Sequence, residues 1–384
     1  MDNKVQLPDE VVATQGAGWV GAVSATIESG LDLTVWEPVT DHAVLPGRPT
    51  PFSWSVVAPT LGEGYRRTFS QFNLPWPGEG DTFCLHQGLP YRRRSVALDD
   101  TVEDPAYGNR WTQTGLASRG NKTAEALMAS ASEIVARTHR WYTRVQQTRW
   151  GQADLLQVME EIENLGNSLQ AARGQLGIIQ RAAAARVQQW QRDVWPQATP
   201  AQIDDLIRHA GVYAEALALA GTTGSKQALA DLVSTYGHRA ANELELSTPR
   251  WHEAPPRSDT VWPTTLEPAW AGQAARQRVA EQTLAGRIGF LKRRGFEADV
   301  QWRQRAADLF DQVDDARARW LAGTRIWVIA AAHETEADGR ITQADDIFLL
   351  ELEEVKQLMT GEWNITHRAT LHELVAQRRQ AFAQ

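Results

Sequence analysis

The most informative part of the chain is one charged stretch near its middle, Tyr236-Gly237-His238-Arg239-Ala240-Ala241-Asn242-Glu243-Leu244-Glu245-Leu246-Ser247-Thr248-Pro249-Arg250-Trp251-His252-Glu253. It gathers two histidines, two arginines and three glutamates within eighteen residues. A helical pattern from Ser225 to Tyr236 runs into Gly237, and glycine is the usual residue at a left-handed helix cap. We therefore expect His238 and Arg239 to lie just beyond a helix end.

The second half of this stretch alternates acidic and apolar residues. Glu243 and Glu245 alternate with Leu244 and Leu246, which is the period of an extended strand. The pattern predicts a short β segment at 243–247, with both carboxylates on one side and both leucines anchored on the other.

Composition limits what the protein can be. The 384 residues include 42% hydrophobic residues, enough for a sizeable core, and 39 basic against 47 acidic residues give a net charge of -8. A nucleic-acid partner is therefore not expected. The single cysteine, Cys84, excludes an internal disulfide and indicates a reducing compartment. No apolar run approaches the roughly 20 residues of a membrane span, and we expect a cytoplasmic protein without a membrane partner.

The first third of the chain predicts an extended segment, a helix and a small hairpin. Prolines at 38, 46, 49 and 51 favour an extended segment over Glu37–Trp54 that wraps the helices. A helix capped by Ser53 should then run to about Phe72. Apolar runs broken at a glycine predict a β-hairpin near 75–98.

The rest of the chain predicts a mainly helical, α+β protein in one contiguous body. Apolar residues at threes and fours predict helices at 122–149, 151–192, 200–220, 225–236, 269–290 and 299–333. Gly166 and Gly174 should break the second of these, and four prolines mark a linker at 255–268. Arg317, Trp320 and Trp327 share one stripe of the last helix, a pattern typical both of a helix that lines a polar cavity and of ordinary half-buried packing.

Three separated motifs give the chain a family resemblance. They are Gly237-His238-Arg239 followed by Pro249-Arg250-Trp251, then Leu45-Pro46-Gly47 with Thr50-Pro51 and Trp54-Ser55, and finally Gly339-Arg340-Ile341 with Asp345-Asp346-Ile347-Phe348 and Leu352-Glu353-Glu354-Val355. In their order along Trp36–Val355 they resemble the middle domain of rifampicin phosphotransferases and related phosphoenolpyruvate-synthase-like dikinases. The chain departs from that pattern at Ala240-Ala241-Asn242, where the family usually has glycine-proline.

The resemblance implies a division of labour. In that family an ATP-binding domain phosphorylates a histidine on a swivelling domain, which carries the phosphoryl group to a substrate held by the middle domain. Residues 35–384 resemble that middle domain after an extension at 1–34, with an extended segment and hairpin at 35–100, helices and the Gly-His-Arg motif at 122–253, and C-terminal helices at 268–384. The expected function is the small-molecule-binding component of a split phosphotransferase of secondary metabolism. It would have no cofactor of its own, and ATP and Mg²⁺ would come through separate ATP-binding and swivelling-histidine proteins.

The resemblance and the residue chemistry together suggest a site. His238 or Glu243 would orient or deprotonate the acceptor hydroxyl, and Arg239 would act beside them. Charged and aromatic side chains would bind the substrate, namely Arg250, Trp251, Arg325, Trp320, Trp327 and Trp54.

Other interpretations stay open. The charge cluster could be structural, with Arg239 and Arg250 pairing with nearby glutamates to fasten a loop to the helices. The pocket could serve a freestanding enzyme of elimination, cyclisation or condensation without ATP, or a non-catalytic ligand-binding protein. A further set of aspartates could hold Mg²⁺ against a diphosphate, although the expected arrangement is a solvent-exposed acidic face that alternates with Arg317 and Arg319 at helical ion-pair spacing, with no metal: Asp308, Asp311, Asp314 and Asp315.

Overall fold

A computed structural model describes most of the chain. The described residues are 32, 34–39, 48–73, 82–93, 120–209, 211–223, 226–255, 272–361 and 368–383. The expected extension at 1–34 and the expected linker at 255–268 lie almost wholly outside them.

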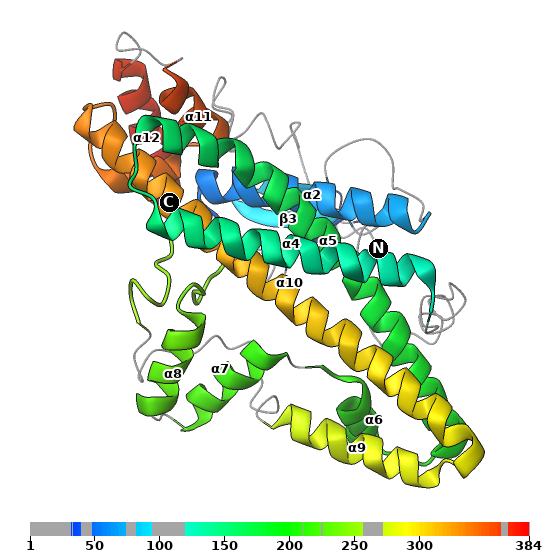
Figure 1. Cartoon of the computed structure of the whole chain (residues 1–384). Helices are drawn as coiled ribbons and strands as arrows, with labels where there is room; N and C mark the ends of the chain where they lie inside the picture. Colours follow the sequence, from blue (N-terminus) through cyan, green and yellow to red (C-terminus); the bar gives the residue numbers. More distant parts are fainter. Residues whose placement is uncertain are drawn as a thin grey trace.

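Two very long antiparallel helices form the axis of the protein. They are α5 (Gln152–Val194) and α10 (Phe290–Ala337), and they pack against each other, against α4 (Lys122–Gln147) and, through α5, against α2 (Pro51–Gln71). Figure 1 shows α10 crossing the whole molecule, with the C-terminal helices at one end and α6 and α9 toward the other. The prediction of a mainly helical protein with a small β element is confirmed.

Helix α5 runs without interruption through Gly166 and Gly174, so the predicted breaks there are wrong. Each glycine sits where another helix crosses closely. A side chain on Gly166 would collide with the Trp320 ring, and one on Gly174 would collide with Thr68. The glycines permit close helix packing here instead of ending the helix, because long-range packing compensates for their low helix propensity.

Tryptophans hold the main core together. Trp320 and Trp327 of α10 are fully buried and donate their indole N–H groups to the carbonyl oxygens of Ile162 (2.9 Å) and Leu155 (2.8 Å) on α5. Trp54 of α2 is also in this core, 1% exposed. The hydrogen bonds remove the cost of burying the indole nitrogens of Trp320 and Trp327, so these two rings act as anchors between helices.

The predicted hairpin is confirmed as β2 (Phe83–His86) and β3 (Leu89–Arg93), joined at Gln87 and Gly88. Both turn residues have positive φ, which matches the twist of a tight hairpin. Strand β1 (Trp36–Pro38) pairs with the other edge of β3, giving the order β1-β3-β2. Pro38 is tolerated because it lies on an edge strand.

The remaining helices are short and surround the axis. The predicted helix at 200–220 is two helices, α6 (Pro200–Ile207) and α7 (Val212–Thr223), because the chain turns at Gly211 with φ of +77°. Helix α6 packs with α9 (Gln273–Arg287), and α7 packs with α8 (Lys226–Tyr236). The 3₁₀ helix η3 (Ala344–Leu349), α11 (Leu352–Thr360) and α12 (Arg368–Ala383) complete the chain. Among the described residues, no helix combines the length and apolarity needed to cross a lipid bilayer.

Two predictions for the central stretch are wrong. Residues 243–247 form turns instead of a β segment, because the two carboxylates bind different partners: Glu243 binds Arg239, while Glu245 reaches Thr50 and Ser53. Gly237 does not have the positive φ of a left-handed cap. It is glycine because a Cβ there would lie 2.7 Å from the carbonyl oxygen of Val233.

The glycine packing gives a matched test. Gly166→Ala should destabilise the protein by about 1–3 kcal/mol, because the new methyl group overpacks the Trp320 contact. Gly286→Ala on α9 should be neutral or stabilising by about 0.5 kcal/mol, since no described atom lies within 4 Å of the place that a Cβ would take there. Urea unfolding followed by far-UV circular dichroism measures both, and equal effects at the two sites would contradict the packing argument.

Candidate functional site

The Gly-His-Arg stretch is a closed loop beyond the end of α8. The amide of Trp251 donates to the carbonyl of Arg239 (2.8 Å), and that of His252 donates to the carbonyl of Gly237 (2.9 Å). Arg250 is buried and donates to the carbonyl of Glu243 (2.9 Å). These bonds fix the loop from both of its ends.

Glu245 attaches this loop to the start of α2. Its carboxylate accepts hydrogen bonds from the backbone N–H of Thr50 (2.9 Å), from the hydroxyls of Thr50 (2.8 Å) and Ser53 (2.7 Å), and from the N–H of Ser247 (2.9 Å). An anion is favoured at a helix N-terminus, where the backbone N–H groups are unpaired. Glu245 is therefore part of the scaffold.

Arg325 fastens the same loop to α10. Its Nε (3.0 Å) and Nη2 (2.9 Å) both pair with the carboxylate of Glu253, and its Nη1 donates to the carbonyl of Leu246 (2.6 Å). Burial lowers the pKa of Arg250 to about 10. The structural interpretation of the charge cluster thus describes Arg250 and Arg325, because each donates a hydrogen bond to a backbone carbonyl group of the loop.

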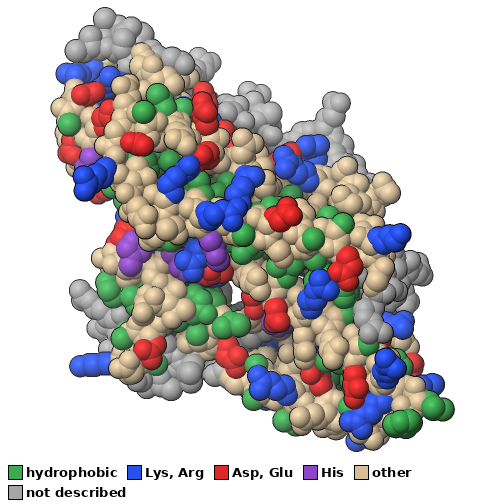
Figure 2. Space-filling model, in the orientation of Figure 1, with side chains coloured by type: hydrophobic (Ala, Val, Ile, Leu, Met, Phe, Trp, Pro, Cys, Tyr) green, Lys and Arg blue, Asp and Glu red, His purple; other side chains and the backbone are tan. Residues whose placement is uncertain are grey.

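A cavity of about 1000 Å³ lies between this loop, the α7–α8 pair and the middle of α10. Figure 2 shows the surface hollowed there, with acidic, basic and histidine side chains gathered around the opening. A space of this size accommodates a small organic molecule. The wall is polar along α10 and apolar where Tyr213, Leu217 and Trp251 meet it.

Helix α10 presents its aspartates to this cavity, and two of them pair with histidines. Asp311 lies 2.9 Å from Nε2 of His209, and Asp315 lies 2.9 Å from Nε2 of His238. Both aspartates line the cavity, as does His209. A second histidine on the wall, His139, lies 3.9 Å from Asp315.

Asp314 is the centre of an arginine cluster. Its oxygens lie 3.2 Å from Arg173, 3.3 Å from Arg239 and 3.0 Å from Arg317. Arg239 also pairs with Glu243 (3.0 Å) and lies over the ring of Tyr213, 3.8 Å from its centre. The expected helical pairing is present, since Arg317 binds Asp314 and Arg319 binds Asp315 (2.9 Å).

Burial and charge set the protonation of these groups. Burial alone would raise the pKa of Asp314, but Arg317, Arg239 and Arg173 hold it well below its ordinary value. Burial likewise opposes ionisation of Asp315, yet the hydrogen bond from His238 and nearby arginines keep its pKa low. Burial lowers the pKa of His238, which favours a neutral imidazole near pH 7. Neutral His238 therefore donates its Nε2 proton to an ionised Asp315.

The structure brings together only some of the predicted site residues. Arg239, Glu243 and Trp251 line the cavity. His238 is 5% exposed and lies behind Asp315, so it reaches the cavity only through that carboxylate. Five predicted residues are outside the wall because they are engaged in the core or in the loop: Arg250, Arg325, Trp54, Trp320 and Trp327.

Sequence reasoning missed several residues of the wall. Arg173, on α5, and His209, after α6, reach the cavity from segments far from the Gly-His-Arg stretch. Arg317 stood out only as part of a stripe and as an ion-pair partner. The single useful signal was the aspartate series on α10, because residues three and four apart share a helix face. Within the described part of the chain, no three acidic, histidine or cysteine side chains are arranged to hold a metal ion.

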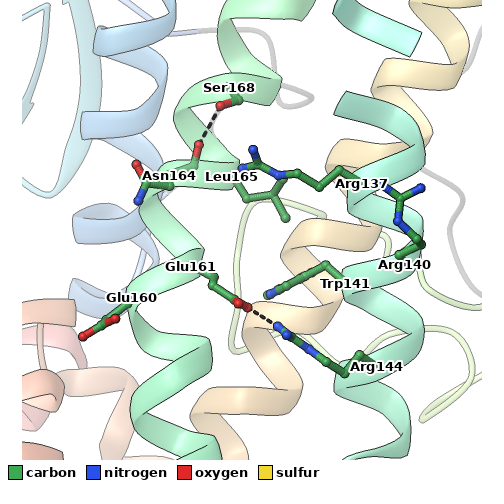
Figure 3. A pocket seen from close by; sticks show the side chains of 9 residues that line it. All are labelled: Arg137, Arg140, Trp141, Arg144, Glu160, Glu161, Asn164, Leu165 and Ser168. Atoms are coloured by element: carbon green, nitrogen blue, oxygen red, sulfur yellow. Dashed lines mark hydrogen bonds and ion pairs between the residues drawn. The ribbon is translucent and has the colours of Figure 1, made fainter. Parts of the chain in front are cut away.

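A second, smaller cavity of about 610 Å³ lies between α4 and α5. Figure 3 shows Arg137 reaching from α4 toward Leu165 of α5, with the Trp141 ring and the Arg144–Glu161 ion pair below. Arg137, Arg140 and Arg144 are all exposed. We take the larger cavity as the candidate site because it combines buried charges with His–Asp pairs.

Comparison with known proteins does not assign the chain to a family: no family model matches it, and no curated protein does.

Because Asp314 binds three arginines, replacing it should cost far more folding stability than replacing another aspartate of α10. Asp314→Asn should destabilise the protein by about 3 kcal/mol, because three arginines would lose the carboxylate that they share. Asp308→Asn, at an exposed position on the same cavity, should change stability by about 0.5 kcal/mol or less. Chemical denaturation of both variants measures this, and a mild Asp314→Asn phenotype would mean that the cluster is solvated.

Proposed function

We propose that this chain holds a small-molecule hydroxyl acceptor in the larger cavity and acts as the acceptor-binding component of an ATP-dependent phosphotransferase. The observation that carries the proposal is the arrangement of the cavity wall, where a His–Asp pair and an arginine cluster border the same space. Transfer of a phosphoryl group to a hydroxyl needs a proton acceptor and cationic groups around the migrating charge.

His209 is the proton acceptor that best fits this role. Its Nε2 is hydrogen-bonded to Asp311, which fixes the ring, and the side chain is 22% exposed on the cavity wall. A carboxylate that accepts from one imidazole nitrogen leaves the other nitrogen as a base. His238, the residue expected from the sequence, acts as a positioning residue for Asp315 in this scheme.

In this proposal the arginines stabilise the negative charge that develops on the transferred phosphoryl group. Arg239 and Arg317 are each 3% exposed, so their charges are weakly screened, and Arg173 adjoins them through Asp314. Cations fixed in place before the reaction stabilise negative charge that develops during it. ATP, Mg²⁺ and the phosphohistidine would be brought by partner modules, in line with the resemblance of the three motifs to the dikinase-like family.

One observation also favours a second candidate, a freestanding enzyme that moves protons without ATP. The His209–Asp311 pair is complete within this chain and needs no group from a partner to accept a proton. Elimination, cyclisation or condensation would use the same base.

The two candidates are separated by one experiment. The chain is incubated with candidate hydroxyl compounds, with or without ATP, Mg²⁺ and purified ATP-binding and phosphohistidine modules of the dikinase-like family. Phosphate transfer that needs all components supports the first proposal. Conversion by the chain alone supports the second, and binding without conversion under any condition would contradict both.

A matched pair of variants tests the base. His209→Gln keeps an N–H group that can reach Asp311 but cannot accept a proton as imidazole does, so turnover should fall about 10²–10⁴-fold. The KM for the acceptor should change little, because the contact with Asp311 remains. His333→Gln is the control, since His333 is 67% exposed on α10 and outside the cavity wall. Unchanged turnover in His209→Gln would exclude His209 as the base.

A further inference from the structure

Two buried arginines of the cavity wall offer more hydrogen-bond donors than their neighbours accept. Each guanidinium group carries five N–H donors. Arg239 donates through Nη1 to Glu243 and Asp314, and Arg317 donates through Nη2 to Asp314. Asp314 is at the same time an acceptor for Arg173. The carboxylate between these guanidinium groups is therefore heavily shared.

Three guanidinium nitrogens of these two arginines have no hydrogen-bond partner within the described part of the chain. Nε of Arg239 and both Nε and Nη1 of Arg317 have no hydrogen-bond partner among the described residues. Both side chains are 3% exposed and both belong to the cavity wall. A buried donor without a partner is destabilising, and because these donors belong to side chains of the cavity wall, an acceptor group of a bound molecule can satisfy them.

The other carboxylates of the wall do not supply this acceptor, because they are engaged or exposed. Asp315 accepts from His238 and from Arg319, both at 2.9 Å. Asp311 is hydrogen-bonded to His209 and to the backbone N–H of Val212. Asp308 is exposed, and its charge is screened by solvent.

The part of the cavity wall next to Arg239 is apolar and aromatic. Tyr213 lies 5.9 Å from Trp251, ring centre to ring centre, and Leu217 and Trp251 belong to one small core cluster against which Tyr213 packs. Tyr213 also faces the Arg239 guanidinium at 3.8 Å. The cavity therefore has a cationic side and an apolar side that meet at Tyr213.

We infer that the cavity is built for an anionic small molecule, one whose carboxylate or phosphate ester binds beside Arg239 and Arg317 while its apolar body packs on Tyr213, Leu217 and Trp251. An anionic group supplies several acceptor oxygens at once, and carboxylate and phosphate oxygens both suit the guanidinium fork. The inference names the ligand class for the cavity and rests on the proposed function only in taking this cavity as the ligand site.

Three probes of similar size test the inference on the unaltered chain. Phenyl phosphate, phenylacetate and benzyl alcohol are titrated by isothermal calorimetry without ATP. The inference predicts that at least one of the two anions binds about tenfold or more tightly than the neutral alcohol. The relative affinities of the two anions identify whether phosphate or carboxylate is preferred. Equal binding of the alcohol, or no binding of either anion, would overturn the inference.

Variants then locate the anion. Arg317→Gln removes one guanidinium group and should weaken anion binding about tenfold or more, with no loss for benzyl alcohol. Arg317→Lys keeps the charge but loses the fork, and should give an intermediate affinity. The control is Arg293→Gln, the same change at an exposed site on the same helix, which should bind like the parent chain. Anion affinity unchanged in folded Arg317→Gln and Arg317→Lys would place the anion elsewhere, which contradicts the inference.

The binding titration tests the ligand class separately from the proposed phosphotransferase activity, because it measures affinity and involves no turnover. Anion binding without phosphate transfer would contradict the phosphotransferase while leaving the ligand class intact. Phosphate transfer to a neutral acceptor, with no anion binding, would support the phosphotransferase and contradict the inferred ligand class.

Discussion

The carboxylate of Glu245 is the interaction on which the arrangement of the site depends. It joins the Gly-His-Arg loop to the N-terminus of α2 through Thr50 and Ser53, which lie 195 and 192 residues away in the sequence. The adjacent residue, Leu246, accepts a hydrogen bond from Arg325 of α10. One short turn thus connects three parts of the chain. Because the helix N-terminus offers several donors and a favourable potential, a single buried acid can hold them together.

The motif segments that gave the family resemblance meet at this junction. Phe52, between Thr50 and Ser53, packs edge to face against Phe348 at 6.2 Å, and Arg325 lies over the same Phe348 ring. Much of the charged sequence is therefore occupied in structural contacts. The charged side chains that can contact a ligand lie on the side of the loop that faces α10, where Arg239 pairs with Glu243 and with Asp314 of α10.

The candidate site combines stability and function in one network. Asp314 pairs with three arginines, of which Arg239 and Arg317 are buried beside the cavity. The N–H groups of Arg239 and Arg317 that are unpaired among the described residues bear on binding because both side chains line the cavity, where an acceptor group of a ligand can reach them.

The sequence alone determined the helical architecture, the hairpin and the pairing of Asp314 and Asp315 with Arg317 and Arg319, because each depends on residues a few positions apart. Only the tertiary structure decided which side chains face the cavity. His209 and Asp311 are 102 residues apart, and Arg173 and Asp314 are 141 apart. Local spacing sets the face of a helix but not the helix that packs against it. For the same reason Trp54, Trp320 and Trp327, which by residue type suited a pocket, became core anchors once α2, α5 and α10 closed around them.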